Sequence, residues 1–342
     1  MTTERTTLLD DFLCRFTSDD WASAVAALLP SIHAVDRTAT RIWFAFFPLA
    51  LRLALDEWDD PEELARRLLL AGTYRLEDRI DSSHVFLYGH RYWPEVRRAI
   101  LEALPPDQQP FARDLESLAR ELAARAAARC KTDVSLLVGI TVVGLMTVRQ
   151  VGSARFAPVP GEVHLPPAVL RQTPDQVLGA RAKDDSQGLF GFLKGLRKEW
   201  TITFNEMDPE ATFALINSQA LTTAAANDKR DYRSRDPRCF VGEGPIPVEC
   251  RTAVCGMCWV GVLGGADKLS AVDPLERRRI AEFGYADTDE SRPIIRLACM
   301  AHAFGAVSIV IPPWNGQFGK CLKARRDEEA RTDAAEEEAA GS

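Results

Sequence analysis

The stretch ECRTAVCGMC (Glu249–Cys258) decides how the fold of this chain is predicted, because it holds three of the chain's eight cysteines. A fourth cysteine ends the segment RLAC at positions 296–299. The resulting spacing is Cys-x4-Cys-x2-Cys, followed by 40 residues and then Cys299. In a chain that stays in a reducing compartment, clustered thiols indicate metal or redox chemistry more often than disulfides.

The N-terminus, MTTERTTLLDDF, indicates such a compartment. It is polar and mixed in charge, whereas a secretory leader has a basic segment followed by an apolar one. The longest apolar run, Val134–Val148, has 15 residues, and a spanning helix needs about 20. We therefore expect a cytoplasmic protein without a membrane span, in which this run is a buried core helix. A membrane-touching segment is the alternative.

Composition sets the broad class. The chain has 342 residues, of which 46% are hydrophobic and 27% charged, which excludes a wholly disordered, collagen-like or multi-span membrane protein. Because domains usually contain about 100–200 residues, the length favours two domains. The net charge of −7 argues against nucleic acid as the main partner.

The pattern along the chain predicts an α+β protein with several parts. Helical periodicity dominates the first part. Apolar residues over 38–55 recur at spacings of one, three and four and predict one amphipathic or nearly buried helix, and Asp60-Pro61 predicts the start of the next. Prolines then interrupt the chain, and a strand pattern begins near Lys198 with WTITF. The predicted parts are an all-α domain (1–150), a connector with a short helix over 174–182 (151–197), a mixed α/β domain (198–320) and a charged tail (321–342).

The four cysteines suit a [2Fe–2S] cluster, which needs four thiolates, two on each iron. One loop can supply three of them only if it curls over the cluster and turns its N–H groups toward the sulfurs. Gly256 permits such a curl, and the distant Cys299 would close the site. Zinc is the weaker alternative, because zinc ligands usually come as two Cys-x2-Cys or Cys-x2-His pairs. Ordinary structural cysteines are the remaining one.

The cysteine spacing resembles that of plant-type [2Fe–2S] ferredoxins. The neighbouring segments are similar too: WTITF (200–204), SQALTTAAA (218–226), GPIPVEC (244–250) and RLACMAHAFGAVSIVIPP (296–313). The resemblance covers about 198–313 and leaves the helical part unrecognised. It implies a β-grasp domain, a sheet of four or five strands with a helix across it. It also implies that Cys250 and Cys255 hold the outer iron and that Cys258 and Cys299 hold the inner one.

The sequence departs from the family at two places. Ala253 stands where the family usually has glycine, and the 40-residue gap before Cys299 is closer to the adrenodoxin branch. The segment 268–292 resembles the interaction region of that branch, whose helix is acidic and docks basic partners. Here Asp273-Pro274 starts a helix that carries three consecutive arginines at 277–279. We therefore expect redox partner proteins without assigning the charge of the docking surface.

These observations predict a one-electron transfer protein whose helical domain serves docking or oligomerisation. Its partners would be a reductase, an electron-accepting enzyme or both. In one alternative, the domain feeds electrons to a second cofactor in or bound to the helical part. In another, the cluster is a redox sensor. We find no nucleotide-binding glycine loop, Gly-x-Ser-x-Gly or His-Glu-x-x-His motif, so the sequence does not decide whether the protein is also an enzyme.

Several other residues have both a functional and a structural interpretation. Cys239 is a spare ligand, a redox-active thiol or an ordinary buried cysteine, and we expect the remaining three cysteines to be structural. A Rieske site needs two histidines, and His302 stands alone near the cysteines. His84 and His90 form either a haem or metal site or part of an aromatic cluster. Trp259 either shields the cluster or packs in the core. The segment 228–238 is a partner contact or a solvated loop.

Overall fold

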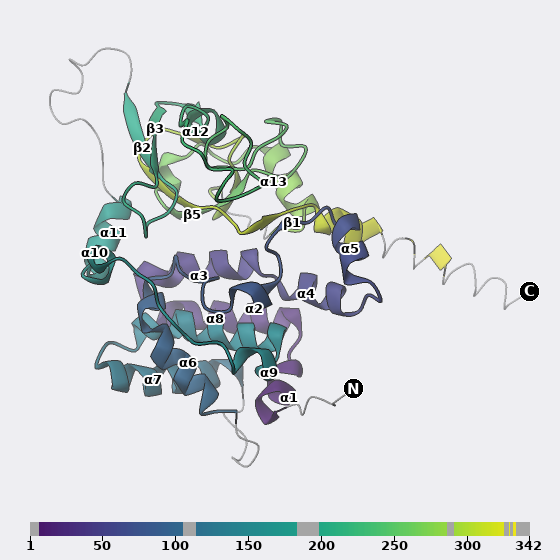
Figure 1. Ribbon diagram of the computed structural model, residues 1–342, viewed down its shortest axis with the longest axis vertical. Helices are drawn as coiled ribbons and strands as arrows, with labels where there is room; N and C mark the ends of the chain where they lie inside the picture. The colour runs from purple at the N-terminus through teal and green to yellow at the C-terminus, as the bar shows by residue number, and fades with distance from the viewer. Residues whose placement is uncertain are drawn as a thin grey trace, which may run out of the picture.

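The computed structural model describes residues 7–104, 114–182, 198–285 and 291–324, together with residues 328, 331 and 332. It contains a layer of helices and, lying on that layer, a part built around a mixed sheet (Figure 1). This arrangement confirms the α+β prediction. Of the predicted connector and tail, residues 183–197 and most of those after 324 lie outside the described residues.

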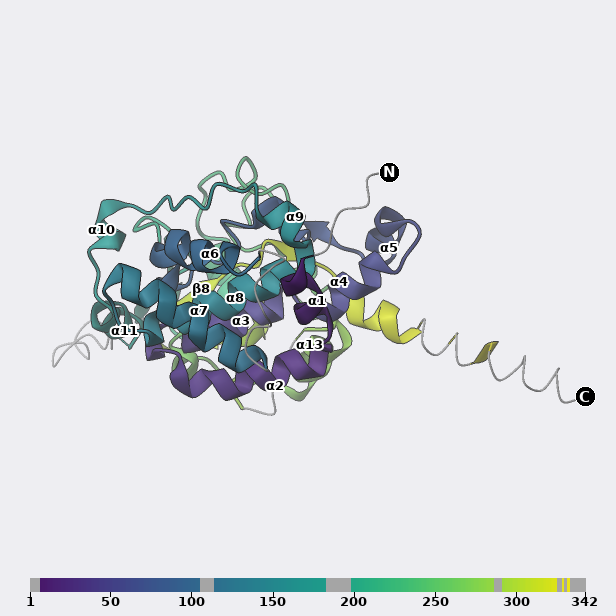
Figure 2. The same cartoon turned by 90° about the horizontal axis from the view of Figure 1, so that it is seen from below.

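The helices of the first layer are α1 (Leu8–Cys14), α2 (Ser18–Leu28), α3 (Ala34–Phe46), α4 (Leu49–Asp56), α5 (Pro61–Arg67), α6 (Trp93–Leu101), α7 (Leu115–Cys130), α8 (Ser135–Val151) and α9 (Ser153–Phe156). The short helices α10 (Pro167–Leu170) and α11 (Pro174–Ala182) follow, and the sheet part adds α12 (Leu221–Ala225) and α13 (Pro274–Glu282). Among its described residues, the helical half has three short 3-10 turns: η1 (Leu29–Ser31), η2 (Leu76–Arg79) and η3 (Tyr88–Tyr92). Figure 2 looks onto the helical layer from below.

Helix α8 is the centre of the helical layer. Nearly all of its residues are buried, and it packs against α3, α6 and α7. A helix that is apolar around its whole circumference needs partners on every side. The apolar run Val134–Val148 is therefore a core helix, as predicted.

The expectation of one continuous helix over 38–55 is wrong. Helix α3 ends at Phe46, and α4 begins at Leu49 after Pro48. A proline has no N–H to donate and disfavours helical geometry at the residue before it, and Phe47 accordingly has φ −125° and ψ 65°. The amide of Gln150 donates to the Phe47 carbonyl at 2.8 Å and so satisfies an acceptor near the break.

By length and composition, one described segment is able to cross a membrane. It is Ala34–Asp56, and 56% of its apolar window is buried inside the protein. A core helix passes the same test of length and hydropathy. The expected absence of a membrane span therefore stays a prediction.

The main sheet has five strands in the order β3-β2-β8-β5-β6. They are β2 (Glu199–Thr203), β3 (Thr212–Ile216), β5 (Trp259–Gly264), β6 (Ile295–Leu297) and β8 (Val307–Val310). The central pair β2 and β8 is parallel, and the other neighbours are antiparallel. Two-residue strands make two further pairs: β1 (Ala71–Gly72) with β9 (Trp314–Asn315), and β4 (Gln219–Ala220) with β7 (His302–Ala303).

The helical layer and the sheet share one hydrophobic core. Helix α3 packs against β5, and Gly261 permits the close approach, since a Cβ there would lie 2.5 Å from Cγ2 of Ile42. The indole of Trp314 donates to the Phe46 carbonyl at 2.6 Å and fastens β9 to α3. The helical half and the sheet part therefore pack directly against each other. The predicted domain boundaries stay a prediction.

Candidate functional site

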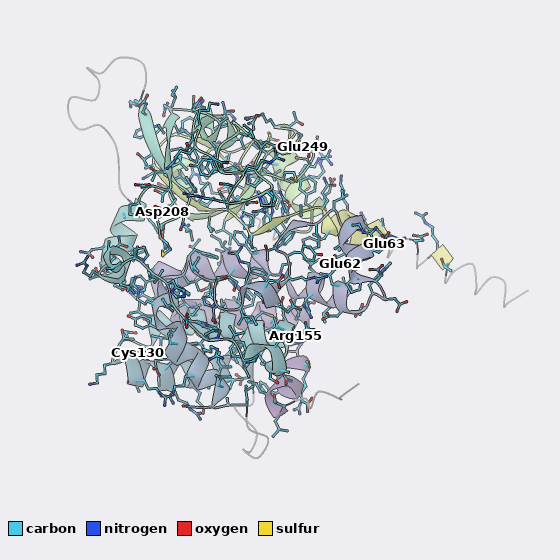
Figure 3. All side chains as sticks on the ribbon, in the orientation of Figure 1. Glu62, Glu63, Cys130, Arg155, Asp208 and Glu249 are labelled. Atoms are coloured by element: carbon cyan, nitrogen blue, oxygen red, sulfur yellow. The ribbon has the colours of Figure 1, made fainter. Side chains whose placement is uncertain are left out.

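The loop 250–258, which directly precedes β5, is tightly curled. Three of its residues have left-handed backbone geometry: Arg251 with φ 54°, Ala253 with φ 58° and Gly256 with φ 69°. Alternation of left-handed and ordinary residues turns successive N–H groups toward one side of a chain and forms an anion-binding concavity. Glu249, the residue before this loop, is labelled in the sheet-containing part in Figure 3.

The sulfur of Cys250 receives these N–H groups. Three backbone amides donate to its Sγ, those of Thr252 at 3.4 Å, Val254 at 3.3 Å and Cys255 at 3.4 Å. Burial opposes ionisation of Cys250, but the N–H of Thr252 and the contact with Cys255 lower the pKa of its thiol to about 7. The loop is therefore built to hold this sulfur as a thiolate.

Ala253 has left-handed backbone geometry, at a position where the ferredoxin family usually has glycine. It is only 1% exposed, and a residue with a Cβ costs about 1–2 kcal/mol in left-handed geometry. The hydrogen bond from the Cys258 thiol and, after it, the backbone hydrogen bond from Ala253 lower the pKa of the Cys299 thiol, against the effect of burial. The loop thus reaches over Cys299 despite the alanine.

Strand pairing brings Cys258 next to Cys299. In the β5–β6 register Trp259 faces Leu297, and the N–H of Ala298 donates to the Cys258 carbonyl at 2.9 Å. The two cysteines are 2% and 8% exposed. The Cys258 thiol donates to the Cys299 sulfur, which together with burial raises the Cys258 pKa well above its ordinary value.

Cys250 and Cys255 form a second pair nearer the surface. Both are partly exposed, and their side chains are hydrogen-bonded to each other. Burial and the bond to Cys250 raise the pKa of the Cys255 thiol. Electrostatic interactions couple the two pairs. The charge of Cys255 acts to raise the pKa of Cys258, and the charge of Cys250 acts to raise the pKa of Cys299.

The four cysteines are thus gathered as two pairs and not around one point. Over the described ranges, no three His, Cys, Asp or Glu side chains converge closely enough to hold a single metal ion. A mononuclear zinc site would need all four thiolates on one ion. Within the described ranges, the four cysteines are therefore two hydrogen-bonded thiol pairs.

Residues far along the chain hold the loop in place, and no sequence pattern identified them. The amide of Gln317 donates to the carbonyls of Val254 at 3.3 Å and Cys255 at 2.9 Å. The amide of Asn315 donates to the Met257 carbonyl at 3.2 Å. Backbone carbonyls of a curled loop have no ladder partner, so these side chains supply one.

Aromatic side chains pack behind the loop. The hydroxyl of Tyr285 donates to the Gly256 carbonyl at 2.8 Å, and its ring stacks on that of Trp259 at 3.9 Å. Trp259 is 1% exposed, and its indole donates to the Trp314 carbonyl at 3.2 Å. These contacts support the core-packing interpretation of Trp259.

The remaining cysteines lie apart from the two pairs. Cys239 is buried and donates to the Pro245 carbonyl at 3.5 Å, and burial raises its thiol pKa to about 11. Cys321 donates to the Arg67 carbonyl at 3.0 Å. Cys14 is exposed and Cys130 partly exposed. None of their described contacts joins them to the loop cysteines.

The histidines also have structural surroundings. Nδ1 of His84 lies 2.9 Å from Nδ1 of His90, and His84 packs on Trp93 at 4.3 Å. Burial lowers the pKa of His90 to about 4. The ring contacts of His84 with His90 and Trp93 place both histidines in an aromatic cluster. His302 is exposed, and its Nδ1 lies 2.9 Å from the Ser218 carbonyl oxygen.

Segment 228–238 folds back on itself. Arg230 is paired with Asp228 and also donates to the carbonyls of Glu210 and Thr212 at 2.6 and 2.7 Å. Arg238 is paired with Asp236. The segment is therefore an ordered loop with internal ion pairs.

No protein-family model, no curated protein and no solved structure matches this chain. A function is accordingly inferred from the contacts of the loop and its cysteines.

Proposed function

We propose that residues 198–320 form a ferredoxin-type domain that binds a [2Fe–2S] cluster and that the protein transfers single electrons. The carrying observation is the arrangement of the four cysteines as two thiol pairs under a loop whose N–H groups point at Cys250. Cys250 and Cys255 would hold the outer iron, and Cys258 and Cys299 the inner one. Their exposures follow that order, since the first pair is partly exposed and the second buried.

The sheet supports a β-grasp fold for this domain. Its first and last strands, β2 and β8, are the parallel pair at the centre. The hairpin partner β3 lies on one side and the antiparallel pair β5 and β6 on the other. Helix α12 packs against β3. The cysteine loop directly precedes β5, so the sheet provides a rigid base for three of the four ligands.

The protein's own groups are suited to such a cluster. When bound, the cluster supplies a one-electron couple. The amides of Thr252, Val254 and Cys255 would stabilise the negative charge on the Cys250 sulfur, and hydrogen bonds to ligand sulfurs are one means of setting a reduction potential. Val254, between the two outer ligands, is 55% exposed. An exchange partner can therefore approach the outer pair closely.

The helical half would dock or oligomerise, so that the cluster is held near one redox partner protein. We assign the protein to the cytoplasm and propose neither nucleic acid nor membrane as its partner. The shared core between α3 and β5 supports a fixed relation between docking surface and cluster. A partner held by the helices would then meet the cluster at one orientation.

The experiment is the isolation of the full chain with its metal content, visible spectrum and EPR spectrum. We expect two irons and two labile sulfides per chain, visible thiolate-to-iron bands, and a rhombic EPR signal only after reduction. The Cys255→Ser variant should lose or strongly change these signals. The matched control Cys321→Ser should keep them, because its thiol donates to the Arg67 carbonyl, away from the loop. A colourless protein with one zinc ion per chain would refute the proposal.

A further inference from the structure

A cavity separate from the cysteine loop lies where the helical layer meets the sheet part. It has a volume of about 380 Å³. Its walls come from α2, α3 and the start of α4, which all belong to the helical layer (Figure 1), from Met146 of α8, and from Gly284, Tyr285 and Ile294 of the sheet part. Small-molecule sites commonly measure about 300–1,000 Å³ and lie between domains. The size and the place of this cavity are therefore those of a binding site.

The helical walls follow from spacing along the sequence. The lining residues of α2 and the turn after it stand at positions 18, 21, 22, 25, 26 and 29, and those of α3 and the turn after it at 41, 44, 45 and 48. Spacings of three and four place each set on one helix face. Ala22, Ala26 and Ala45 are among these residues. A methyl group fills little space, so the two faces leave room that larger side chains would fill.

Aromatic rings line the cavity from both halves of the protein. Trp21 and Phe44 belong to the helical half and Tyr285 to the sheet part, and Met146 adds a thioether. Trp21 and Tyr285 are 1% and 4% exposed, so packing holds both rings in place. Such rings bind another ring in edge-to-face or offset contacts, and a thioether also makes favourable contacts with aromatic rings. The wall therefore suits an aromatic occupant better than an aliphatic one of the same size.

The walls also carry little charge. Of the described residues that line the cavity, Arg41 alone is charged, and it already has an interaction partner. An ionised ligand would lose its hydration in these apolar surroundings, which is costly for a charge without a partner. An uncharged ring instead gains free energy when its apolar surface leaves water. The cavity therefore fits a neutral molecule better than an ion.

We propose that this cavity binds one small, uncharged molecule with an aromatic ring system. The proposal does not rest on the iron–sulfur cluster, since no described residue that lines the cavity belongs to the loop 250–258. The two sites are nevertheless neighbours, because Tyr285 lines the cavity and its hydroxyl donates to the Gly256 carbonyl at 2.8 Å. The occupant would lie against a residue that supports the cysteine loop. Failure of one proposal leaves the other standing.

The test is calorimetric titration of the full chain at neutral pH with β-naphthol, an uncharged molecule of two fused aromatic rings. The comparison compound β-naphthoate keeps the rings but is charged, and decahydro-β-naphthol keeps the hydroxyl group but is saturated. We expect β-naphthol to bind one site per chain, about tenfold or more tightly than β-naphthoate and about threefold or more tightly than the saturated compound. Absence of binding, or equal or tighter binding of either comparison compound, would overturn the proposal.

The decisive variant is Ala26→Phe. Ala26 is exposed on α2 and lines the cavity, so the new ring would occupy the space without replacing a buried side chain, and affinity for β-naphthol should fall by about tenfold or more. The matched control is Ala27→Phe, at the next exposed alanine of the same helix, outside the lining. Ala22→Phe, also exposed and in the lining, is the second variant if the first does not fold. Unchanged affinity in both lining variants, or an equal loss in the control, contradicts the assignment.

Discussion

The ion pair between Glu276 of α13 and Arg296 of β6 supports a quantitative test of what holds the cysteine site together. Both side chains are 0% exposed. The guanidinium donates from Nε and Nη2 to the two carboxylate oxygens, each at 2.8 Å, and the N–H of Leu297 adds a third bond at 2.9 Å. Arg296 stands three residues before Cys299, so the pair anchors the segment that carries the distant thiol.

We predict that Glu276→Gln lowers the free energy of unfolding by about 3–5 kcal/mol, because loss of one partner of a buried pair leaves the other charge buried and uncompensated. Whole domains are stable by about 5–15 kcal/mol, so the loss is a large share of the total. Because β6 positions Cys299, we also expect weaker retention of iron in this variant.

The assay is urea denaturation followed by fluorescence and circular dichroism, with iron content measured in parallel. The matched control is Glu282→Gln on the same helix, whose pair with Arg279 is partly exposed and should contribute little to stability because water screens it. In the double variant Glu276→Met with Arg296→Met no unpaired charge remains, so most of the stability should return. A loss below about 1 kcal/mol in the single variant, or a double variant as unstable as the single one, would refute this reasoning.

Two further predictions concern the helical half and its contact with the sheet. Burial raises the pKa of Asp36 to about 6, although the N–H groups of Gly89 and Tyr88 oppose the shift. The folded state therefore binds this proton more tightly than the unfolded chain, whose value is about 3.8. This tighter proton binding stabilises the folded state by about 3 kcal/mol. The stabilisation is fully present below the unfolded pKa of 3.8 and is lost as pH rises through the folded pKa of about 6. Urea midpoints measured from about pH 3.5 to about pH 7 should show this loss in the natural chain, and a profile unchanged in Asp36→Asn would contradict it. Gly261→Ala should cost about 1–3 kcal/mol because its Cβ would meet Ile42 at 2.5 Å. Gly179→Ala, with open space around it, should cost nothing, and equal costs in the two variants would count against the proposed contact.

Local signals predicted many element boundaries because the forces that end a helix act within a few residues. The sequence Asp60-Pro61 indicates a helix start, and the Asp60 side chain accepts from the N–H groups at the start of α5. Pro174–Ala182 is observed over the predicted range. Asp273 caps α13 as its position indicates. In each case the cap, the proline and the first turn are neighbours in sequence.

The predicted continuous helix over 38–55 failed for a reason that is also local. The apolar spacing continues through the segment, but Pro48 cannot donate to the ladder, and the chain breaks there. The break is tolerated because Gln150 and Trp314 satisfy carbonyls at its edge. Those two partners lie far along the chain, and nothing near Pro48 indicates them.

Cysteine spacing by itself identified the four candidate ligands, because three of them must share one short loop. The sequence also has a glycine, Gly256, at a position where the loop has left-handed geometry. Which cysteines pair was implied only by the family resemblance. The two observed pairs follow from the β5–β6 register and from the curl over 250–258, which together place Cys299 beside Cys258.

The sequence by itself thus determined several helix starts and the candidate ligand cysteines, because caps and ligand spacing are short-range properties. Only the tertiary structure decided that helices and sheet share one core and that Glu276 neutralises Arg296. Each of these depends on contacts between residues that are well separated along the chain. Burial then converts such contacts into large energies, since an unpaired charge or donor is costly only where water cannot reach it.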